Sequence, residues 1–201
     1  MLDDFQELAN LCSVSEGDSG RAVCRRDVLR LGLVGVLAAS VPMISMKKAH
    51  AAGLRDWRVS LSQAHTDEKF SGVYRVGDQY LPDAFRRLNF ILRDHRTGEV
   101  FPMDPHVIDI VSIIQSKMRT GRPLKVLSGY RSPRTNSMLR HETRGVAKNS
   151  FHMYGQAMDI RDDDYSSNRI RKIACSIKAG GVGFYPRSDF VHVDTGTVRT
   201  W

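Results

Sequence analysis

SFHMYGQAMD (residues 150–159) and DFVHVD (residues 189–194) are the most informative stretches of this 201-residue chain. Together they supply two histidines and a carboxylate, namely His152, His192 and Asp159. Catalytic zinc sites use such a set of three protein ligands and leave a coordination position for water. The two stretches therefore predict a metal centre. Imidazole and carboxylate ligands suit Zn²⁺, although they also bind other divalent ions.

The first stretch predicts a turn that runs into a strand. Gly155 permits a turn after His152, and residues 156–161 have the character of a strand. Ala157 and Asp159 are two residues apart, so they share one face of that strand. The small side chain of Ala157 leaves space for a metal beside Asp159.

The second stretch predicts a neighbouring strand over residues 190–194, from which His192 reaches the metal. Asp194 lies two residues beyond His192 and shares its strand face. A carboxylate in that position can orient a ligating imidazole. We therefore expect Asp194 to support the metal ligands, and we assign the same role to Ser150.

Patterns on both sides of these stretches predict an α+β domain with a small, mainly antiparallel sheet, because helices stand before and among strands adjacent in sequence. Apolar residues at steps of three and four predict helices, and short apolar runs predict strands. Proline in the first turn and a preceding Asp or Ser mark the helix starts. Helices are expected from Pro82 to about Leu92, from Pro105 to Met118, from Ser132 to about Leu139 and from Ser166 or Ser167 to Gly180, and strands at residues 57–63, 73–76, 124–128, 156–161, 182–185 and 190–194.

The first quarter of the chain has the features of an export signal. An uncharged, mostly apolar run of 16 residues (31–46) follows Arg25 and Arg26 and precedes the small-x-small sequence AHA at residues 49–51. The run is shorter than the roughly 20 residues that span a bilayer, and the three features together are typical of a secretory signal peptide. Cleavage after Ala51 divides the chain into residues 1–51 and a domain at 52–201. An uncleaved anchor and a buried helix are the alternatives.

Charge and cysteine content exclude other classes of protein. The chain has a net charge of +8, and a basic exported protein is attracted to anionic polymers such as the cell wall. We expect no nucleic-acid partner, because basic residues do not alternate with aromatic ones along any segment. Only Cys175 lies in the expected domain, which excludes a disulfide framework there.

Longer segments carry a family resemblance. The pattern Ser-x-His-x-x-Gly-x-Ala-x-Asp followed by a distant His resembles the zinc D,D-carboxypeptidase and D-alanyl-D-alanine dipeptidase superfamily. SGYRSPRTN (128–136), VAKNSFH (146–152), GGVGFYPRSDFVHVDTG (180–196) and VRTW (198–201) are similar to its exported murein-endopeptidase branch. The resemblance covers about residues 57–201. The segment CRRDVLR (24–30) resembles the twin-arginine export motif.

This resemblance implies roles for further residues. His152, Asp159 and His192 would hold Zn²⁺, and Arg131 would hold the scissile carbonyl oxygen. Asp189, three residues before His192, would be the general base. Positions three apart on a strand face opposite sides, so this role requires Asp189 to lie in the loop before the strand.

The resemblance further implies a monomeric periplasmic zinc endopeptidase. It would hydrolyse peptide cross-links of peptidoglycan, including those that join two diaminopimelate residues. Its other partner would be the twin-arginine export machinery, and it would meet the membrane only transiently through the signal. Two alternatives stay open, namely a D,D- or L,D-carboxypeptidase of wall peptides and a non-catalytic peptidoglycan-binding protein that retains the metal site. The acid at position 189 favours an enzyme.

Overall fold

The computed structural model describes residues 55–143 and 145–201. The expected signal peptide and its cleavage site lie outside the described residues, so the division into residues 1–51 and 52–201 stays a prediction. The strands are β1 (Asp56–Gln63), β2 (Lys69–Val76), β3 (Gln79–Tyr80), β4 (Leu124–Ser128), β5 (Ala157–Arg161), β6 (Gly181–Tyr185), β7 (Phe190–Asp194) and β8 (Arg199–Thr200). The helices are α1 (Pro82–Ile91), α2 (Pro105–Met118), α3 (Pro133–Glu142), α4 (Ser167–Ile177) and the 3-10 helix η2 (Phe151–Tyr154).

All eight strands form one sheet, in the order β3-β2-β1-β4-β5-β7-β6-β8. Two pairs are parallel, β1 with β4 and β6 with β8, and the other five are antiparallel. The α+β class is confirmed, but the sheet is mixed and larger than expected. The parallel pair β1 and β4 joins strands that are separated in sequence by β2, β3 and two helices, a pairing that has no local sequence signal.

The helices begin where capping residues and prolines stand. Pro82 occupies the first turn of α1, and the side chains of Asp104 and Ser132 accept a backbone N–H from the first turns of α2 and α3. The helix α4 ends before the expected glycine, because Lys178 already adopts the left-handed conformation at φ 55°. Within the described residues, no helix is long and apolar enough to cross a membrane.

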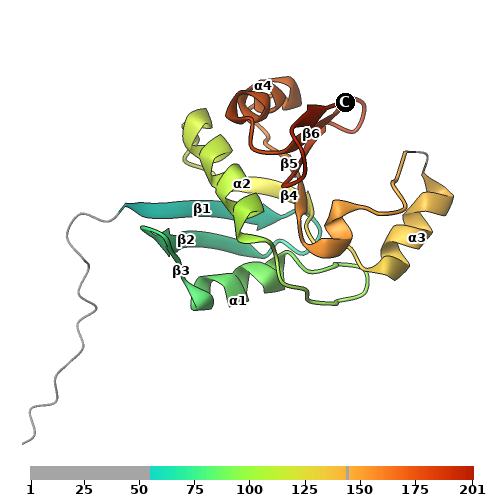
Figure 1. The fold of residues 1–201 in the computed structure, drawn as a ribbon, viewed down its shortest axis with the longest axis horizontal. Helices are drawn as coiled ribbons and strands as arrows, with labels where there is room; N and C mark the ends of the chain where they lie inside the picture. Colours follow the sequence, from blue (N-terminus) through green and yellow to red (C-terminus); the bar gives the residue numbers. More distant parts are fainter. Residues whose placement is uncertain (1–54, 144) are drawn as a thin grey trace, which may run out of the picture. The chain divides into compact units, whose positions relative to one another are not determined.

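The hydrophobic core lies between the sheet and the helices. The helices α2 and α4 pack against each other and against β1, β6 and β7, while α1 packs on β2 (Figure 1). Figure 1 shows α3 apart from these helices, where it carries the chain towards η2. The helices therefore support the central strands, and the loop after β4 and the segment before β5 are left to form a site.

Candidate metal centre

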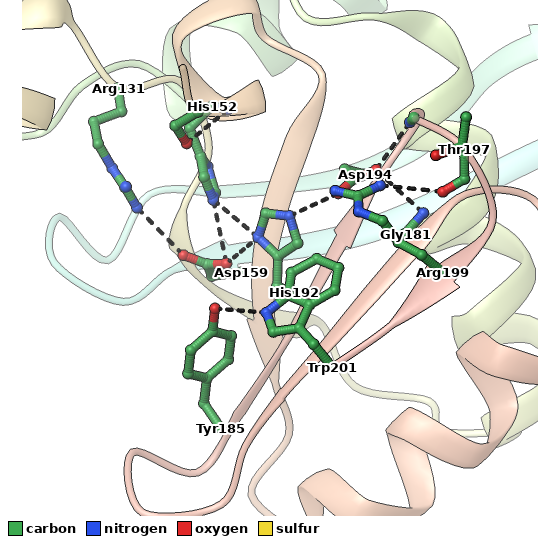
Figure 2. A network of polar contacts seen from close by, with 12 residues as sticks. Arg131, His152, Asp159, Gly181, Tyr185, His192, Asp194, Thr197, Arg199 and Trp201 are labelled. Carbon is green, nitrogen blue, oxygen red and sulfur yellow. Dashed lines mark hydrogen bonds and ion pairs between the residues drawn. The ribbon is translucent and has the colours of Figure 1, made fainter. Parts of the chain in front are cut away.

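Three side chains from different elements converge at one point (Figure 2). His152 comes from η2, Asp159 from β5 and His192 from β7. His152 Nε2 lies 3.2 Å from Asp159 Oδ1 and 3.2 Å from His192 Nδ1, which lies 2.9 Å from the same carboxylate oxygen. All three side chains are buried, and their ligand atoms lie within 4.8 Å of one another. This geometry suits a single metal ion.

The backbone explains the convergence. Asp159 and His192 are direct partners in the antiparallel pair of β5 and β7, so both side chains project from the same face. His152 reaches them because Gly155 reverses the chain in the left-handed conformation, at φ 65°. A Cβ on Gly155 would collide with the carbonyl oxygen of Pro102. Only glycine fits this turn, as the sequence pattern predicts.

Supporting hydrogen bonds aim the imidazoles. His152 Nδ1 lies 2.7 Å from the carbonyl oxygen of Gly129, which can only accept a hydrogen bond. His192 Nε2 lies 3.1 Å from Asp194 Oδ2. In its neutral form each ring therefore donates through one nitrogen and turns the lone pair of the other towards the common point, which is the arrangement that metal-binding histidines need. The donor set and its tautomers thus fit a divalent ion such as Zn²⁺.

The electrostatics of the cluster favour positive charge. Burial lowers the pKa of His152, so this ring is neutral. Burial also opposes the charged form of His192, but hydrogen bonds to Asp159 and Asp194 outweigh it and raise its pKa to about 9. Burial alone would raise the pKa of Asp159, yet the two histidines hold it well below its usual range. The two ionised carboxylates on either side of His192 provide an environment for a cation.

Ser150 and Asp194 lie beside the ligands. The Ser150 hydroxyl accepts from the backbone N–H of His152 at 3.4 Å and begins η2. Asp194 is completely buried, and it also accepts from Gly181 and Arg199. The structure therefore places both residues where they can support the ligands.

Arg131 lies at the edge of the metal centre, on the loop after β4. Its Nη2 lies 3.5 Å from Asp159 Oδ2 and 3.4 Å from the hydroxyl of Ser128. Its Nε–H is buried and has no hydrogen-bond partner among the described residues. A buried donor without a partner costs free energy. Arg131 also lines the cleft over the metal centre, so its guanidinium can receive an oxygen atom from a substrate.

Asp189 lies in the hairpin turn between β6 and β7 (residues 186–189), as the argument from strand parity requires. It is exposed and adopts the left-handed conformation at φ 50°. It makes no hydrogen bond or ion pair to any part of the chain that the structure describes. Ser188 and Phe190 on either side line the cleft, whereas Asp189 is not among its lining residues.

A cleft of about 780 Å³ opens over the metal centre. The loop before η2 forms one wall, and the hairpin turn and the C-terminal residues form the other. Asn136 on α3 holds the first wall in place, since its Nδ2 donates to the carbonyl oxygens of Ala147 and Lys148 at 3.1 and 3.2 Å.

The C-terminal residues contribute to the site in a way that the sequence reading missed. The ring of Trp201 lies 5.4 Å from that of His192, and its Nε1 donates to the hydroxyl of Tyr185 at 3.0 Å (Figure 2). A Cβ at position 183 would lie 2.7 Å from the Trp201 ring, so Gly183 makes room for the indole. The segment VRTW was noted for its resemblance, but nothing in its composition indicates a wall of the cleft.

Comparisons with known proteins find similar sequences over most of the chain. The family model described as Peptidoglycan L,D-endopeptidase MepK matches residues 50–201. The chain is 40% identical over 177 residues to Peptidoglycan L,D-endopeptidase MepK of Escherichia coli (strain K12), covering 88% of this chain and 96% of that protein. It is 41% identical over 138 residues to Probable peptidoglycan L,D-endopeptidase MepK of Haemophilus influenzae, covering 68% of this chain and 74% of that protein.

Proposed function

This chain belongs to the peptidoglycan L,D-endopeptidase MepK family, and from that premise we propose that it hydrolyses peptide cross-links of peptidoglycan at the metal centre, with Zn²⁺ as the metal. It is a peptidase. The observation that carries the proposal is the convergence of His152, Asp159 and His192 beside the unpartnered Nε–H of Arg131. The three ligands and Arg131 line the same cleft.

His152 Nε2, Asp159 Oδ1 and His192 Nδ1 would hold the metal. When bound, Zn²⁺ lowers the pKa of a coordinated water and polarises a carbonyl group. Arg131 donates to the carbonyl oxygen of the scissile amide as negative charge develops on it. Its guanidinium is fixed by Asp159 and Ser128 before substrate arrives. Loss of a single donor of this kind costs on the order of 10²–10³ in rate.

Asp189 is our candidate for the general base. It would accept a proton from the attacking water and deliver it to the leaving amine. Two observations support this role: its place in the turn directly before β7, and the two neighbouring residues that line the cleft. Among the described residues that line the cleft, the only carboxylate is Asp159, which is a proposed ligand.

We further propose that residues 1–51 carry the chain to the periplasm through the twin-arginine machinery, and that residues 52–201 act there as a monomer. The paired arginines at positions 25 and 26 before the apolar run support this route. Replacing both by lysine should leave the protein in the cytoplasm, as cell fractionation would detect. Unchanged export of the double variant would refute the route.

Digestion of purified peptidoglycan sacculi tests the activity. We expect mass spectrometry to show cross-linked peptides separating into monomers, and we expect a chelator to stop the reaction. Release of free D-alanine alone would identify a carboxypeptidase and refute the endopeptidase. Metal binding without any hydrolysis of sacculi would identify a wall-binding protein.

A further inference from the structure

The cleft carries more positive than negative charge. Three arginines line it, Arg131, Arg187 and Arg199, against the single carboxylate of Asp159. Two of the three already have acidic partners, because Arg131 lies 3.5 Å from Asp159 and Arg199 lies 2.7 Å from Asp194. Arg187 forms no hydrogen bond or ion pair within residues 55–143 and 145–201. It is therefore the cation of the cleft wall that is free to bind a ligand.

The hairpin turn that carries Arg187 is anchored at its base. The rings of Tyr185 and Phe190 stack across the turn with centroids 4.5 Å apart and planes at 13°. The hydroxyl of Tyr185 in turn accepts from Nε1 of Trp201. Arg187 itself is exposed, so its guanidinium keeps its full set of donors at the entrance of the cleft.

The cross-link between two diaminopimelate residues presents an anion close to the scissile bond. The nitrogen of the scissile bond belongs to the second amino-acid centre of one diaminopimelate residue. The carbon that bears this nitrogen also bears a carboxylate. An arginine binds a carboxylate through two parallel hydrogen bonds, which gives both affinity and orientation.

We propose that Arg187 binds this carboxylate and thereby determines specificity for cross-links with a free acid beside the leaving amine. The inference rests on the proposed function and adds the substrate group that the cleft recognises, which is the carboxylate beside the leaving amine. Asp189 delivers a proton to the leaving amine in that mechanism, and it stands on the same turn as Arg187. The leaving side of the substrate must therefore lie against this turn, which brings its carboxylate to the guanidinium.

Two soluble cross-linked peptides test the proposal. They differ only at the carbon that bears the scissile nitrogen, where one carries a carboxylate and the other a carboxamide. The wild-type protein should favour the carboxylate peptide about tenfold in kcat/KM, mostly through KM, since hydrogen bonds to charged groups contribute on that scale. Arg187→Ala should bring the ratio close to 1, and Arg187→Lys should give an intermediate ratio.

Arg140→Ala is the matched control. Arg140 is an exposed arginine of α3 that does not line the cleft, so this variant loses the same charge and should keep the wild-type ratio. A wild-type ratio in Arg187→Ala, or equal losses on both peptides, would overturn the role of Arg187 and leave the endopeptidase in place. Failure of the metal-loaded wild-type protein to cleave either peptide or sacculi would overturn the proposed function and the inference with it.

Discussion

Replacing Asp194 by Asn tests whether this carboxylate supports metal binding by orienting His192, because the substitution leaves all three proposed ligands in place. The Asp194 carboxylate is completely buried, and its Oδ1 accepts from the backbone N–H groups of Gly181 and Gly196 at 3.1 and 2.9 Å. Its Oδ2 lies 3.1 Å from His192 Nε2 and 2.7 Å from Arg199 Nη2. In Asp194→Asn the amide oxygen can keep the two backbone contacts. Its NH₂ group then faces His192 Nε2 and Arg199 Nη2, which are themselves donors, so both hydrogen bonds are lost.

The loss can be estimated from these contacts. A hydrogen bond to a charged group contributes about 1.5–3 kcal/mol, and the contact with His192 is buried enough to count in full. The Arg199 side chain is 38% exposed, so its ion pair contributes less than about 1 kcal/mol. We expect the free energy of unfolding to fall by about 2–3 kcal/mol. Metal affinity should fall about 10- to 100-fold, because His192 loses the acceptor that fixes its tautomer.

Competition with a chromogenic chelator measures the zinc Kd, and urea unfolding measures stability. Asp109→Asn is the control. Asp109 is a buried carboxylate of α2 that accepts from Tyr74, Tyr80 and Arg75 near the β2–β3 edge of the sheet. It should lose similar stability and keep the wild-type Kd. A zinc Kd within about twofold of the wild type in Asp194→Asn would refute the supporting role.

Three further predictions concern catalysis and stability. Asp189→Asn should lower kcat on sacculi or cross-linked peptides about 10²- to 10⁴-fold with zinc content unchanged, as expected for a lost general base; retained kcat would remove Asp189 from the mechanism. Arg131→Ala should lower kcat about 10²- to 10³-fold with the zinc Kd little changed, and a loss of zinc instead would show that Arg131 mainly holds Asp159. Burial, together with His65, Arg96 and Arg131, lowers the pKa of His95 to about 4 from 6.5, against the opposing effect of Asp94. The unfolded chain therefore binds the proton first, and stability due to this ring should be lost as the pH falls from about 6.5 to 4, by about 1–2 kcal/mol; urea unfolding of His95→Gln should show a correspondingly smaller loss over this pH range.

Local signals in the sequence were enough to predict most elements and the strand faces on which Asp159 and His192 lie. Pro82, Asp104 and Ser132 mark helix starts through capping chemistry that acts within one turn. The faces on which His192 and Asp159 lie follow from strand alternation, and Gly155 marks the reversal between His152 and Asp159. These features depend on neighbours only a few residues away, so a single sequence contains them.

The remaining features depend on contacts between distant segments. The parallel pairing of β1 with β4 and the placing of Trp201 over His192 arise from packing across the whole domain. Strand alternation requires Asp189 to precede β7, but it does not predict that Asp189 is exposed and absent from the residues that line the cleft. The sequence likewise does not show that Arg131 and Arg199 have acidic partners while Arg187 has none among the described residues, because this depends on the folded structure.

The most direct test of the account is to measure zinc content and sacculus digestion together, on the purified wild-type protein and on His152→Ala. We predict one zinc per wild-type chain and the release of peptides cut between an L and a D centre, with both lost in the variant. Cross-link cleavage that survives in metal-free protein or in His152→Ala would contradict the assignment of the metal centre as the catalytic site.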